Sequence, residues 1–390
     1  MPPERKTEIL YLNHVSQMSG AEASLLSLLT HLDTGVYRPV VGLPAPGPLV
    51  AQLRAMDIEV VFLEHPRLSR TANPLSLLRQ CLDLRRGAAR IAGHAEEEAV
   101  EIIHANSLSS ALAAARAARN GAALVWHVRD LRLPRRITRW LLSRVDAVVA
   151  ISSAVAARLA ALDSHAADKT RVVYNGVDTG AFAPRPSRAK LLQELGLPES
   201  ARLVGGVGQL VPWKNWPRFL SVGADVAARV ANTHLLVIGG DLFHDRPHYQ
   251  AELQAYAEDL AIGRITHFLG HRADIAEVVS ALDVFVHCTD EEPLGRAIME
   301  AMSLERPVVA VRSGGPMELI VDGESGLLAP PKNTYALADR AVQALKDRDL
   351  AERLGKAARQ RIEAHFRPEQ TARLIEQVYQ DVLWQRRERR

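Results

Sequence analysis

Short apolar runs alternate with helical patterns along both halves of the 390-residue chain. In the first half, the runs that predict buried strands span residues 9–12, 39–43, 59–63, 102–104, 123–127 and 147–151. In the second half, they span residues 203–207, 234–239, 266–268, 284–287, 307–311 and 326–328. Such alternation is typical of parallel sheets covered by helices. The pattern therefore predicts an α/β fold with two doubly wound domains in tandem.

Helical patterns fill many of the intervals, over residues 21–32, 109–119, 216–230, 249–260, 275–282, 295–303 and 334–347. Between the halves, Asn175-Gly-Val-Asp178 marks a turn, and Pro184 and Pro186 follow it. We therefore expect a linker near residues 178–187, with domains over residues 1–180 and 187–367. No short internal repeat and no low-complexity segment interrupts either half.

The last helical pattern begins at Pro368 and extends to about Trp384. Its apolar positions Leu374, Val378 and Val382 lie four residues apart, which is the spacing of one helical face. We treat residues 368–390 as a separate C-terminal helix.

A basic amphipathic pattern covers residues 134–144, where Ile137, Trp140, Leu141 and Leu142 fall on or near one stripe. Contact with an anionic membrane surface is one interpretation. The stripe is short and lies between two predicted core strands, so we favour packing of these side chains against the core.

Composition excludes several classes of protein. Apolar residues make up 47% of the chain, charged residues make up 24%, and the net charge of +3 is too small to indicate a nucleic-acid partner. Cys81 and Cys288 are the only cysteines, which argues against a disulfide framework or a cysteine metal site. The N-terminus resembles no signal peptide, and no run of 18 apolar residues occurs. A cytoplasmic location is expected.

The segment over residues 290–302 carries the strongest functional signal. It follows a predicted strand and ends in good helix formers, so it predicts a tight turn and a helix N-terminus at a sheet edge. Free N–H groups and the helix dipole favour phosphate at such a position. Glu292 lies in the turn and Glu300 lies in the helix. Two carboxylates beside an anion site suit a phosphate-bearing polyol such as a nucleotide sugar.

Three further segments place polar or small residues at predicted strand ends. Ser19, Gly20 and Ala21 open a helix after the first strand, where small residues allow either a tight turn or close approach of an anion. His127 ends a strand and could contact a substrate oxygen, although a lone histidine is more often structural. His104 and Asn106 are weaker candidates of the same kind.

The glycine-rich segment over residues 205–215 fails as a dinucleotide-binding fingerprint. Val211 occupies the position of the third glycine, and no acid follows at the expected distance. A reductase is therefore disfavoured. Lys214 remains as a cation at the same sheet edge as Glu292, where it could meet a diphosphate or be a solvated surface lysine. Gly314 and Gly315 at a later strand end indicate close approach to a ligand or a plain turn.

At this point the chain resembles the retaining glycosyltransferases of family 4, which have the GT-B fold. The resemblance covers nearly the whole chain. Its most specific part is Glu292-Pro-Leu-Gly-Arg-Ala-Ile-Met-Glu300, which matches the family's E-x7-E motif. Residues 20–22, His127, residues 175–178, Lys214 and residues 314–315 follow in the expected order.

The resemblance implies two Rossmann-like domains facing across a cleft, with the C-terminal helix crossing back to the first domain. The acceptor would bind in the first domain and the nucleoside diphosphate sugar, UDP- or GDP-linked, in the second. The acceptor would be a glycan, a lipid-linked glycan or a small molecule. Weak peripheral contact with a membrane would involve the first domain. The resemblance implies no bound metal and no cofactor, because cations and helix dipoles take the charge that develops on the diphosphate.

The resemblance also implies roles for the matched residues. Glu292 would hold hydroxyls of the transferred sugar, Glu300 the nucleotide ribose, and Lys214 the leaving diphosphate. His127 would contact the sugar near the reacting carbon. Further donor contacts would come from the backbone or side chains of Gly20, Ala21, His271, Arg272, Leu294, Gly295, Arg296 and Ala297.

Gln209 departs from the family pattern, which commonly has an arginine at this position. Glutamine can bind a phosphate by hydrogen bonds but brings no charge. Arg296 or Arg312 could compensate, donor binding could be weaker, or the diphosphate could bind differently. Two alternatives to a glycosyltransferase therefore stay open. One is a sugar-nucleotide epimerase, and the other is a non-catalytic protein that binds a nucleotide sugar. Arginines at 67, 70, 79, 85 and 86 would suit a phosphorylated or lipid-linked acceptor, but a solvated face explains them better.

Overall fold

The computed structural model describes residues 5–65, 73–118, 121–243 and 245–388, and it divides into two compact units. The first unit consists of residues 1–176 and 368–390, and the second consists of residues 177–367. The chain therefore leaves the first unit close to the predicted linker and returns to it at Pro368.

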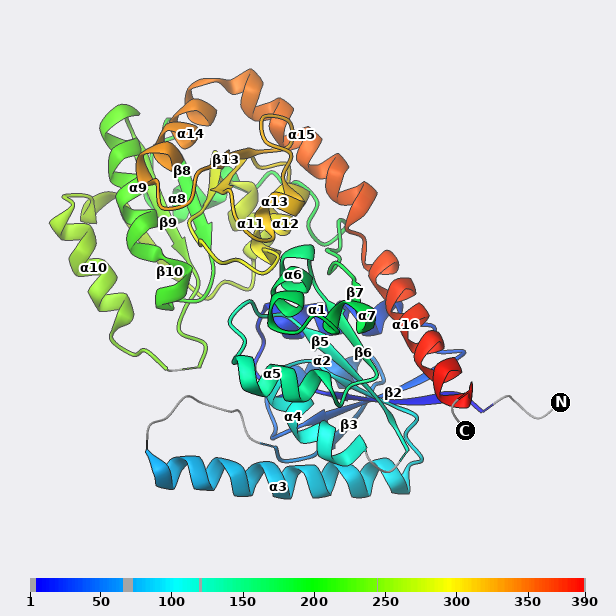
Figure 1. The fold of residues 1–390 in the computed structure, drawn as a ribbon. Helices are drawn as coiled ribbons and strands as arrows, with labels where there is room; N and C mark the ends of the chain where they lie inside the picture. Colours follow the sequence, from blue (N-terminus) through cyan, green and yellow to red (C-terminus); the bar gives the residue numbers. More distant parts are fainter. Residues whose placement is uncertain (1–4, 66–72, 119–120, 244, 389–390) are drawn as a thin grey trace. The chain divides into compact units, whose positions relative to one another are not determined.

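The first unit is built on a seven-stranded sheet in the order β3-β2-β1-β4-β5-β6-β7, and every strand pair is parallel (Figure 1). Its strands are β1 (Thr7–Leu12), β2 (Tyr37–Leu43), β3 (Glu59–Phe62), β4 (Ile102–Ala105), β5 (Ala123–Val128), β6 (Ala147–Ala150) and β7 (Thr170–Val172). Its helices are α1 (Gly20–His31), α2 (Pro48–Ala55), α3 (Pro74–Glu97), α4 (Leu108–Ala117), α5 (Arg135–Leu142), α6 (Ser153–Leu162), α7 (Ala166–Lys169) and α16 (Pro368–Glu388).

The second unit has a six-stranded sheet in the order β10-β9-β8-β11-β12-β13, again with parallel pairing. Its strands are β8 (Arg202–Val207), β9 (Thr233–Ile238), β10 (Thr266–Gly270), β11 (Val284–His287), β12 (Val308–Val311) and β13 (Leu327–Ala329). Its helices are α8 (Arg188–Glu194), α9 (Trp216–Arg229), α10 (Tyr249–Asp259), α11 (Ile275–Ser280), α12 (Arg296–Ser303), α13 (Pro316–Leu319), α14 (Thr334–Lys346) and α15 (Arg348–His365), with short 3-10 helices at Pro212–Lys214 and Gly263–Ile265.

The central strands explain why the apolar runs of the sequence are continuous rather than alternating. Strands β4, β5, β6, β11 and β12 are buried at every position, because helices cover both faces of each sheet. The predicted α/β fold class is confirmed for both halves. Strand β7 and several helices, among them α3, α6, α8 and α15, were not among the predicted elements. Strand β7 is three residues long and partly exposed, so its apolar signal is weak.

Helix α16 belongs to the first unit although it is the last element of the chain. Ala372, Ile375, Val378, Tyr379 and Val382 are buried in the core formed by β1, β2 and α1. In Figure 1 this helix, drawn in red, runs beside α1, which it contacts. The predicted apolar face was partly wrong, because Leu374 is 42% exposed and Ile375 lies on the buried side instead.

Helix α5 also differs from its predicted packing. Thr138, Leu141 and Leu142 are buried, but Ile137 and Trp140 are 41% and 38% exposed. Only part of the stripe therefore faces the core, and an aromatic and a β-branched side chain remain at the surface.

The arginines considered for an acceptor separate into two groups. Arg79, Arg85 and Arg86 are exposed on α3, as a solvated face requires. Arg67 and Arg70 lie outside the described residues. Within the described ranges, no helix combines the length and the apolar character needed to cross a membrane.

Candidate active site

The carboxyl edge of the second sheet has one position where the strand order reverses, between β8 and β11. Ligands of open α/β sheets bind at such a switch point, because the loops of the two strands diverge there. Lys214 follows β8 and Glu292 follows β11. The fold therefore brings these two residues, 78 positions apart in the sequence, to one place.

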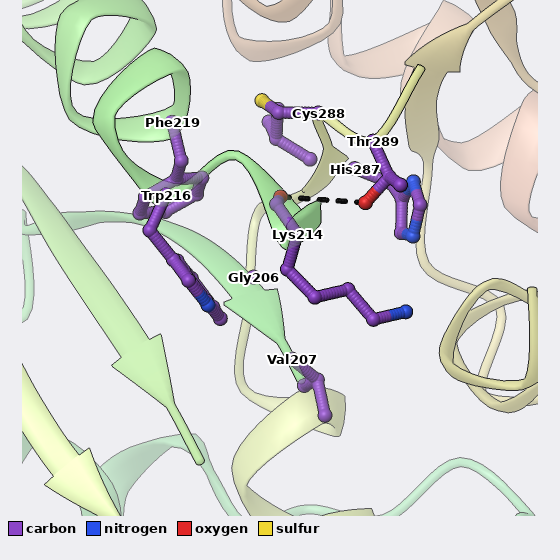
Figure 2. A pocket seen from close by; sticks show the side chains of 9 residues that line it. Gly206, Val207, Lys214, Trp216, Phe219, His287, Cys288 and Thr289 are labelled. Carbon is purple, nitrogen blue, oxygen red and sulfur yellow. Dashed lines mark hydrogen bonds between the residues drawn. The ribbon is translucent and has the colours of Figure 1, made fainter. Parts of the chain in front are cut away.

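Lys214 and Glu292 form an ion pair, with 2.7 Å between Lys214 Nζ and Glu292 Oε2; the Glu292 side chain is buried and that of Lys214 is 17% exposed. His287, the last residue of β11, donates from Nε2 to the same carboxylate oxygen at 3.0 Å. The Lys214 ammonium also lies 4.2 Å from the centre of the Trp213 ring. Figure 2 shows Lys214 and His287 lining one small pocket with Thr289, whose hydroxyl donates to the Lys214 carbonyl at 3.3 Å.

The charge state of Glu292 follows from these contacts. Burial raises the pKa of its carboxyl, but the Lys214 ammonium and the hydrogen bond from His287 outweigh burial and lower the pKa to about 2. Glu292 is therefore an acceptor for hydrogen bonds at neutral pH and cannot act as a general acid. His287 was missed as a site residue, although its position at the end of β11 is a signal that the sequence contains.

Gly314 and Gly315 support the turn that holds Glu292. The Gly315 amide donates to the Glu292 carbonyl at 2.9 Å. A side chain at Gly314 would place its Cβ 2.4 Å from that carbonyl oxygen, and a side chain at Gly315 would lie 2.2 Å from the Leu294 Cα. Gly314 also has a φ of +57°, where glycine is favoured. The double glycine therefore allows close approach of protein backbone, whereas the sequence suggested a ligand or a plain turn.

Helix α12 begins beside Glu292. Gly295, its N-cap at φ +106°, has no side chain to cap the helix, and the positive end of the helix dipole lies at this turn. Leu294, one residue earlier, is 2% exposed and anchors the turn in the core. The structure thus places the predicted donor-binding residues of this segment together at the switch point.

Glu300 lies in α12 and is paired with Arg296 at 2.7 Å between Glu300 Oε1 and Arg296 Nε. Burial raises the pKa of Glu300, and the Arg296 guanidinium offsets only part of that effect. Burial therefore disfavours the charged form of Glu300. A ligand hydroxyl that donated a hydrogen bond to Glu300 would stabilise that charged form.

Arg296 and Arg312, the two candidates to replace the arginine missing at Gln209, are each held by a carboxylate. The Gln209 carbonyl accepts from Trp216 Nε1 at 2.8 Å, which fixes the backbone. Arg312 is paired with Asp322, and Arg296 is paired with Glu300. Either arginine would have to leave its partner to reach a phosphate.

The loop after β10 gives a mixed result. His271 is exposed, so its side chain can meet a ligand. The guanidinium of Arg272 is bound by Glu194 and Asp274, with 2.5 Å to Glu194 Oε1 and 2.7 Å to Asp274 Oδ1. The Arg272 side chain is thus committed to holding α8 and α11, and only its backbone remains for the predicted contact.

In the first unit, Gly20 and Ala21 form the N-terminus of α1, as predicted. Here the chain supplies its own anion. The Glu22 carboxylate accepts from the Ser19 amide at 3.1 Å and from Asn13 Nδ2 at 2.9 Å, and it is 1% exposed. This capping box already satisfies part of the helix terminus. A role of Gly20 and Ala21 in diphosphate binding stays a prediction.

His127 ends β5 and is 1% exposed. Its Nδ1 lies 3.0 Å from His104 Nε2 and 3.3 Å from Arg129 Nη2, while its Nε2 has no hydrogen-bond partner within the described chain. Burial, with the positive charge of Arg129, lowers the pKa of His127 well below its usual range. The imidazole is neutral at pH 7, so we expect a positioning contact rather than proton transfer.

A search of the described residues finds no group of three or more histidine, cysteine, aspartate and glutamate side chains arranged to hold a metal ion. Lys214, the α12 N-terminus and Arg296 are the groups of this site that can balance anionic charge. The expectation that no metal or cofactor is needed stays a prediction.

Two parallel doubly wound units, the second with a cation, a carboxylate and a helix N-terminus at its switch point, suit a ligand that carries both hydroxyls and phosphate. Residues 187–361 match the family described as Glycosyl transferases group 1, and residues 18–181 match Glycosyltransferase Family 4. Together these matches span most of the chain. It belongs to the family 4 type of glycosyltransferases with the GT-B fold.

Individual relatives agree with this assignment. The chain is 29% identical to N-acetyl-alpha-D-glucosaminyl L-malate synthase of Bacillus anthracis over 55% of this chain and 54% of the relative. It is 32% identical to D-inositol 3-phosphate glycosyltransferase of Corynebacterium urealyticum over 56% and 53%. These matches span about half the length of each relative. Anabaena Alr3699/HepE, solved in complex with UDP and glucose, superposes with a TM-score of 0.82 at 27% identity, over 96% of this chain and 99% of the other.

Proposed function

We propose that the protein transfers a sugar from a nucleoside diphosphate sugar to an acceptor with retention of anomeric configuration. The observation that carries the proposal is the Lys214–Glu292–His287 cluster beside the N-terminus of α12. A polyol hydroxyl and a diphosphate are the two chemical groups that this cluster can bind side by side. Solved complexes of HepE with UDP and with UDP-glucose support a UDP-sugar over a GDP-sugar as donor.

Each part of the donor has a matching group in the second unit. The diphosphate would accept from the α12 amides and from Lys214, which would stabilise the charge of the departing diphosphate. Glu292 would accept from hydroxyls of the transferred sugar, and Glu300 from the ribose. The Lys214–Glu292 pair would loosen as the ammonium turns to phosphate, because the phosphate charge competes with Glu292 for the same cation.

Retention and metal independence are the finer parts of the proposal. Both rest on the likeness of residues 292–300 to the E-x7-E motif. The low pKa of Glu292 is compatible with a carboxylate that stabilises positive charge on the sugar and exchanges no proton. His127, in the first unit, would contact the sugar as a neutral imidazole.

The acceptor would be a glycan, a lipid-linked glycan or a small molecule, bound by the first unit. Helix α5 supports a weak peripheral contact with a membrane from the cytoplasmic side. Its outer surface holds Arg135, Arg136 and Arg139 around exposed Ile137 and Trp140, a combination suited to anionic lipid.

Two other functions would use the same site. An epimerase would bind the same donor and isomerise it without an acceptor. A non-catalytic binding protein would explain the uncharged Gln209, but the Glu292 and Lys214 pair argues against loss of function.

A ligand screen by thermal unfolding tests the donor assignment. UDP-sugars and GDP-sugars are compared at concentrations well above micromolar, because a ligand at a hundred times its Kd stabilises the folded state by about 2.7 kcal/mol. Product analysis of the stabilising donor, incubated first alone and then with acceptor glycans or lipids, follows. Isomerised donor without acceptor would identify an epimerase. Binding with no transfer and no isomerisation would favour the binding protein.

A further inference from the structure

Four buried aromatic side chains form a line through the first unit from α16 to the end of β5. The hydroxyl of Tyr379 lies 2.9 Å from that of Tyr11 and 2.6 Å from His104 Nδ1. His104 Nε2 lies 3.0 Å from His127 Nδ1. All four side chains are at most 1% exposed, so water does not compete for these hydrogen bonds.

The bonds have a direction, because each imidazole in the line is neutral. Burial with the charge of Arg129 lowers the pKa of His104 to about 3 and lowers the pKa of His127 as well. The Tyr379 hydroxyl donates to Tyr11, so its oxygen accepts from the Nδ1–H of His104. A neutral imidazole has one N–H, so His104 Nε2 is an acceptor and takes the Nδ1–H of His127.

Arg129 opposes this arrangement. Its Nη2 lies 3.3 Å from His127 Nδ1 and can only donate, so this contact favours the other tautomer of His127. The same Nη2 also lies 3.3 Å from Asn106 Oδ1. An amide oxygen only accepts hydrogen bonds, so this contact is favourable with either tautomer of His127. The contact of His127 Nδ1 with His104 is the shorter of the two, 3.0 Å against 3.3 Å, and it continues through Tyr379.

We infer that Tyr379 is a positioning residue that, through His104, holds His127 as the Nδ1–H tautomer with Nε2 as a hydrogen-bond acceptor. His127 Nε2 is buried and has no partner in the described part of the chain, so it is ready to accept from a ligand hydroxyl. The identification of the ligand group as a sugar hydroxyl rests on the proposed function. The assignment of the tautomer does not. Helix α16 thereby acts on a site residue through His104.

The tautomer can be read directly from two-bond nitrogen–proton correlation spectra of the full chain labelled with 15N-histidine, without any ligand. The spectrum of His127→Gln assigns the His127 signals. We expect a protonated Nδ1 and an unprotonated Nε2 in the wild type. A protonated Nε2 there would overturn the inference.

Tyr379→Phe keeps the ring and removes the hydroxyl. His104 then loses the acceptor for its Nδ1–H and is better satisfied by donating from Nε2 to His127 Nδ1. That bond agrees with the Arg129 contact, so His127 should change to the Nε2–H form. Tyr37→Phe is the matched control, because the Tyr37 hydroxyl also meets α16, at the Glu376 carbonyl, but lies outside the line. An unchanged tautomer in Tyr379→Phe, or the same change in Tyr37→Phe, would contradict a specific role of Tyr379.

Transfer kinetics separate this inference from the proposed function. With an active donor and acceptor, Tyr379→Phe should lower kcat/KM about tenfold, with Tyr37→Phe unaffected, since a donor replaces an acceptor at His127. Wild-type kcat/KM in Tyr379→Phe, despite the changed tautomer, would overturn the positioning role. A wild type with the expected tautomer but no transfer would count against the proposed function alone, and it would leave the assignment of the tautomer supported.

Discussion

Lys214 Nζ and Glu292 Oε2 lie 2.7 Å apart in an ion pair that joins the ends of two neighbouring strands, β8 and β11. Each charge is neutralised by the other before any ligand binds. An anionic ligand must therefore compete with Glu292 for Lys214, while a polyol gains a carboxylate whose charge is already secured. The ion pair therefore favours a ligand that carries both an anionic group and hydroxyl groups.

Glu292→Gln should abolish most transfer. The amide keeps the shape of the side chain but lacks the charge that would stabilise the sugar in the transition state, so we expect kcat to fall by about a hundredfold or more. Initial rates with saturating donor measure the effect. Glu291→Gln is the matched control, since Glu291 is the exposed neighbour. Activity of Glu292→Gln equal to that of the control would remove Glu292 from the mechanism. Glu292→Ala is less suitable, because it leaves Lys214 without its partner.

The unfolding free energies of the wild type and of Glu292→Gln should depend differently on pH. The folded-state pKa of Glu292 is about 2, below its ordinary value of 4.5, so its ion pair stabilises the fold above pH 4.5 and is lost as pH falls toward 2. Glutamine takes up no proton. The difference in unfolding free energy between the wild type and Glu292→Gln should narrow by about 2 kcal/mol between pH 6 and pH 3. Urea unfolding at these pH values measures it, and a constant difference would contradict the low pKa.

Glu300→Gln should separate stability from binding. Burial raises the pKa of Glu300, so its charged form destabilises the fold at neutral pH. The variant should unfold at a higher temperature than wild type at pH 7, and this gain should vanish once the pH is below the ordinary glutamate pKa. Donor affinity should fall about tenfold by calorimetry, because a charged acceptor for the ribose is lost. Tighter donor binding by the variant would argue against contact with the ribose.

The fold class and the approach of Lys214 to Glu292 could be predicted because they depend on local pattern. Apolar runs mark strands, and carboxyl ends of parallel strands meet at one edge, so residues that follow them converge. The contacts of Gly314 with the Glu292 carbonyl could not be predicted, since two adjacent glycines fit a turn equally well. Tyr379 and His104 are 275 positions apart, and their contact depends on which face of α16 packs on the sheet. That face was misjudged because Leu374 and Ile375 are both apolar, and only packing decides between them.

Gly314→Ala should weaken both stability and activity. The residue has a φ of +57°, and a Cβ would lie 2.4 Å from the Glu292 carbonyl oxygen, so the turn must move. Gly323→Ala is the matched control, because Gly323 also has a positive φ, +80°, but a Cβ there meets no atom within 4 Å. We expect backbone strain to lower the unfolding free energy of both variants by about 1 kcal/mol. In Gly314→Ala the close contact should bring the total loss to several kcal/mol and remove most of the activity. Equal unfolding midpoints of the two would show that the close contact is unimportant.

Removing positive charge from α5 should weaken binding to anionic vesicles. Arg135, Arg136 and Arg139 are exposed on α5, so their charge is available to lipid. Cosedimentation with phosphatidylcholine vesicles, with and without an equal part of phosphatidylglycerol, should show binding only to the mixed vesicles. Changing these three residues to glutamine should reduce binding at least about tenfold.

A triple change at Lys346, Arg348 and Arg353 is the control for α5, since it removes the same charge from α14 and α15. Its binding should match wild type. If both triple variants lose binding alike, net charge and not α5 is responsible. Absence of wild-type binding to the mixed vesicles would end the membrane proposal.

The position of α16 has a consequence for the order in which the chain folds during synthesis. Ile375, Val378 and Tyr379 complete the core of the first unit, yet the ribosome reaches them only after residues 177–367 have been made. The first unit to be translated is therefore the last to close its core. Until then the apolar side chains of β1, β2 and α1 that pack against α16 lack that partner, and His104 has no Tyr379 to bind.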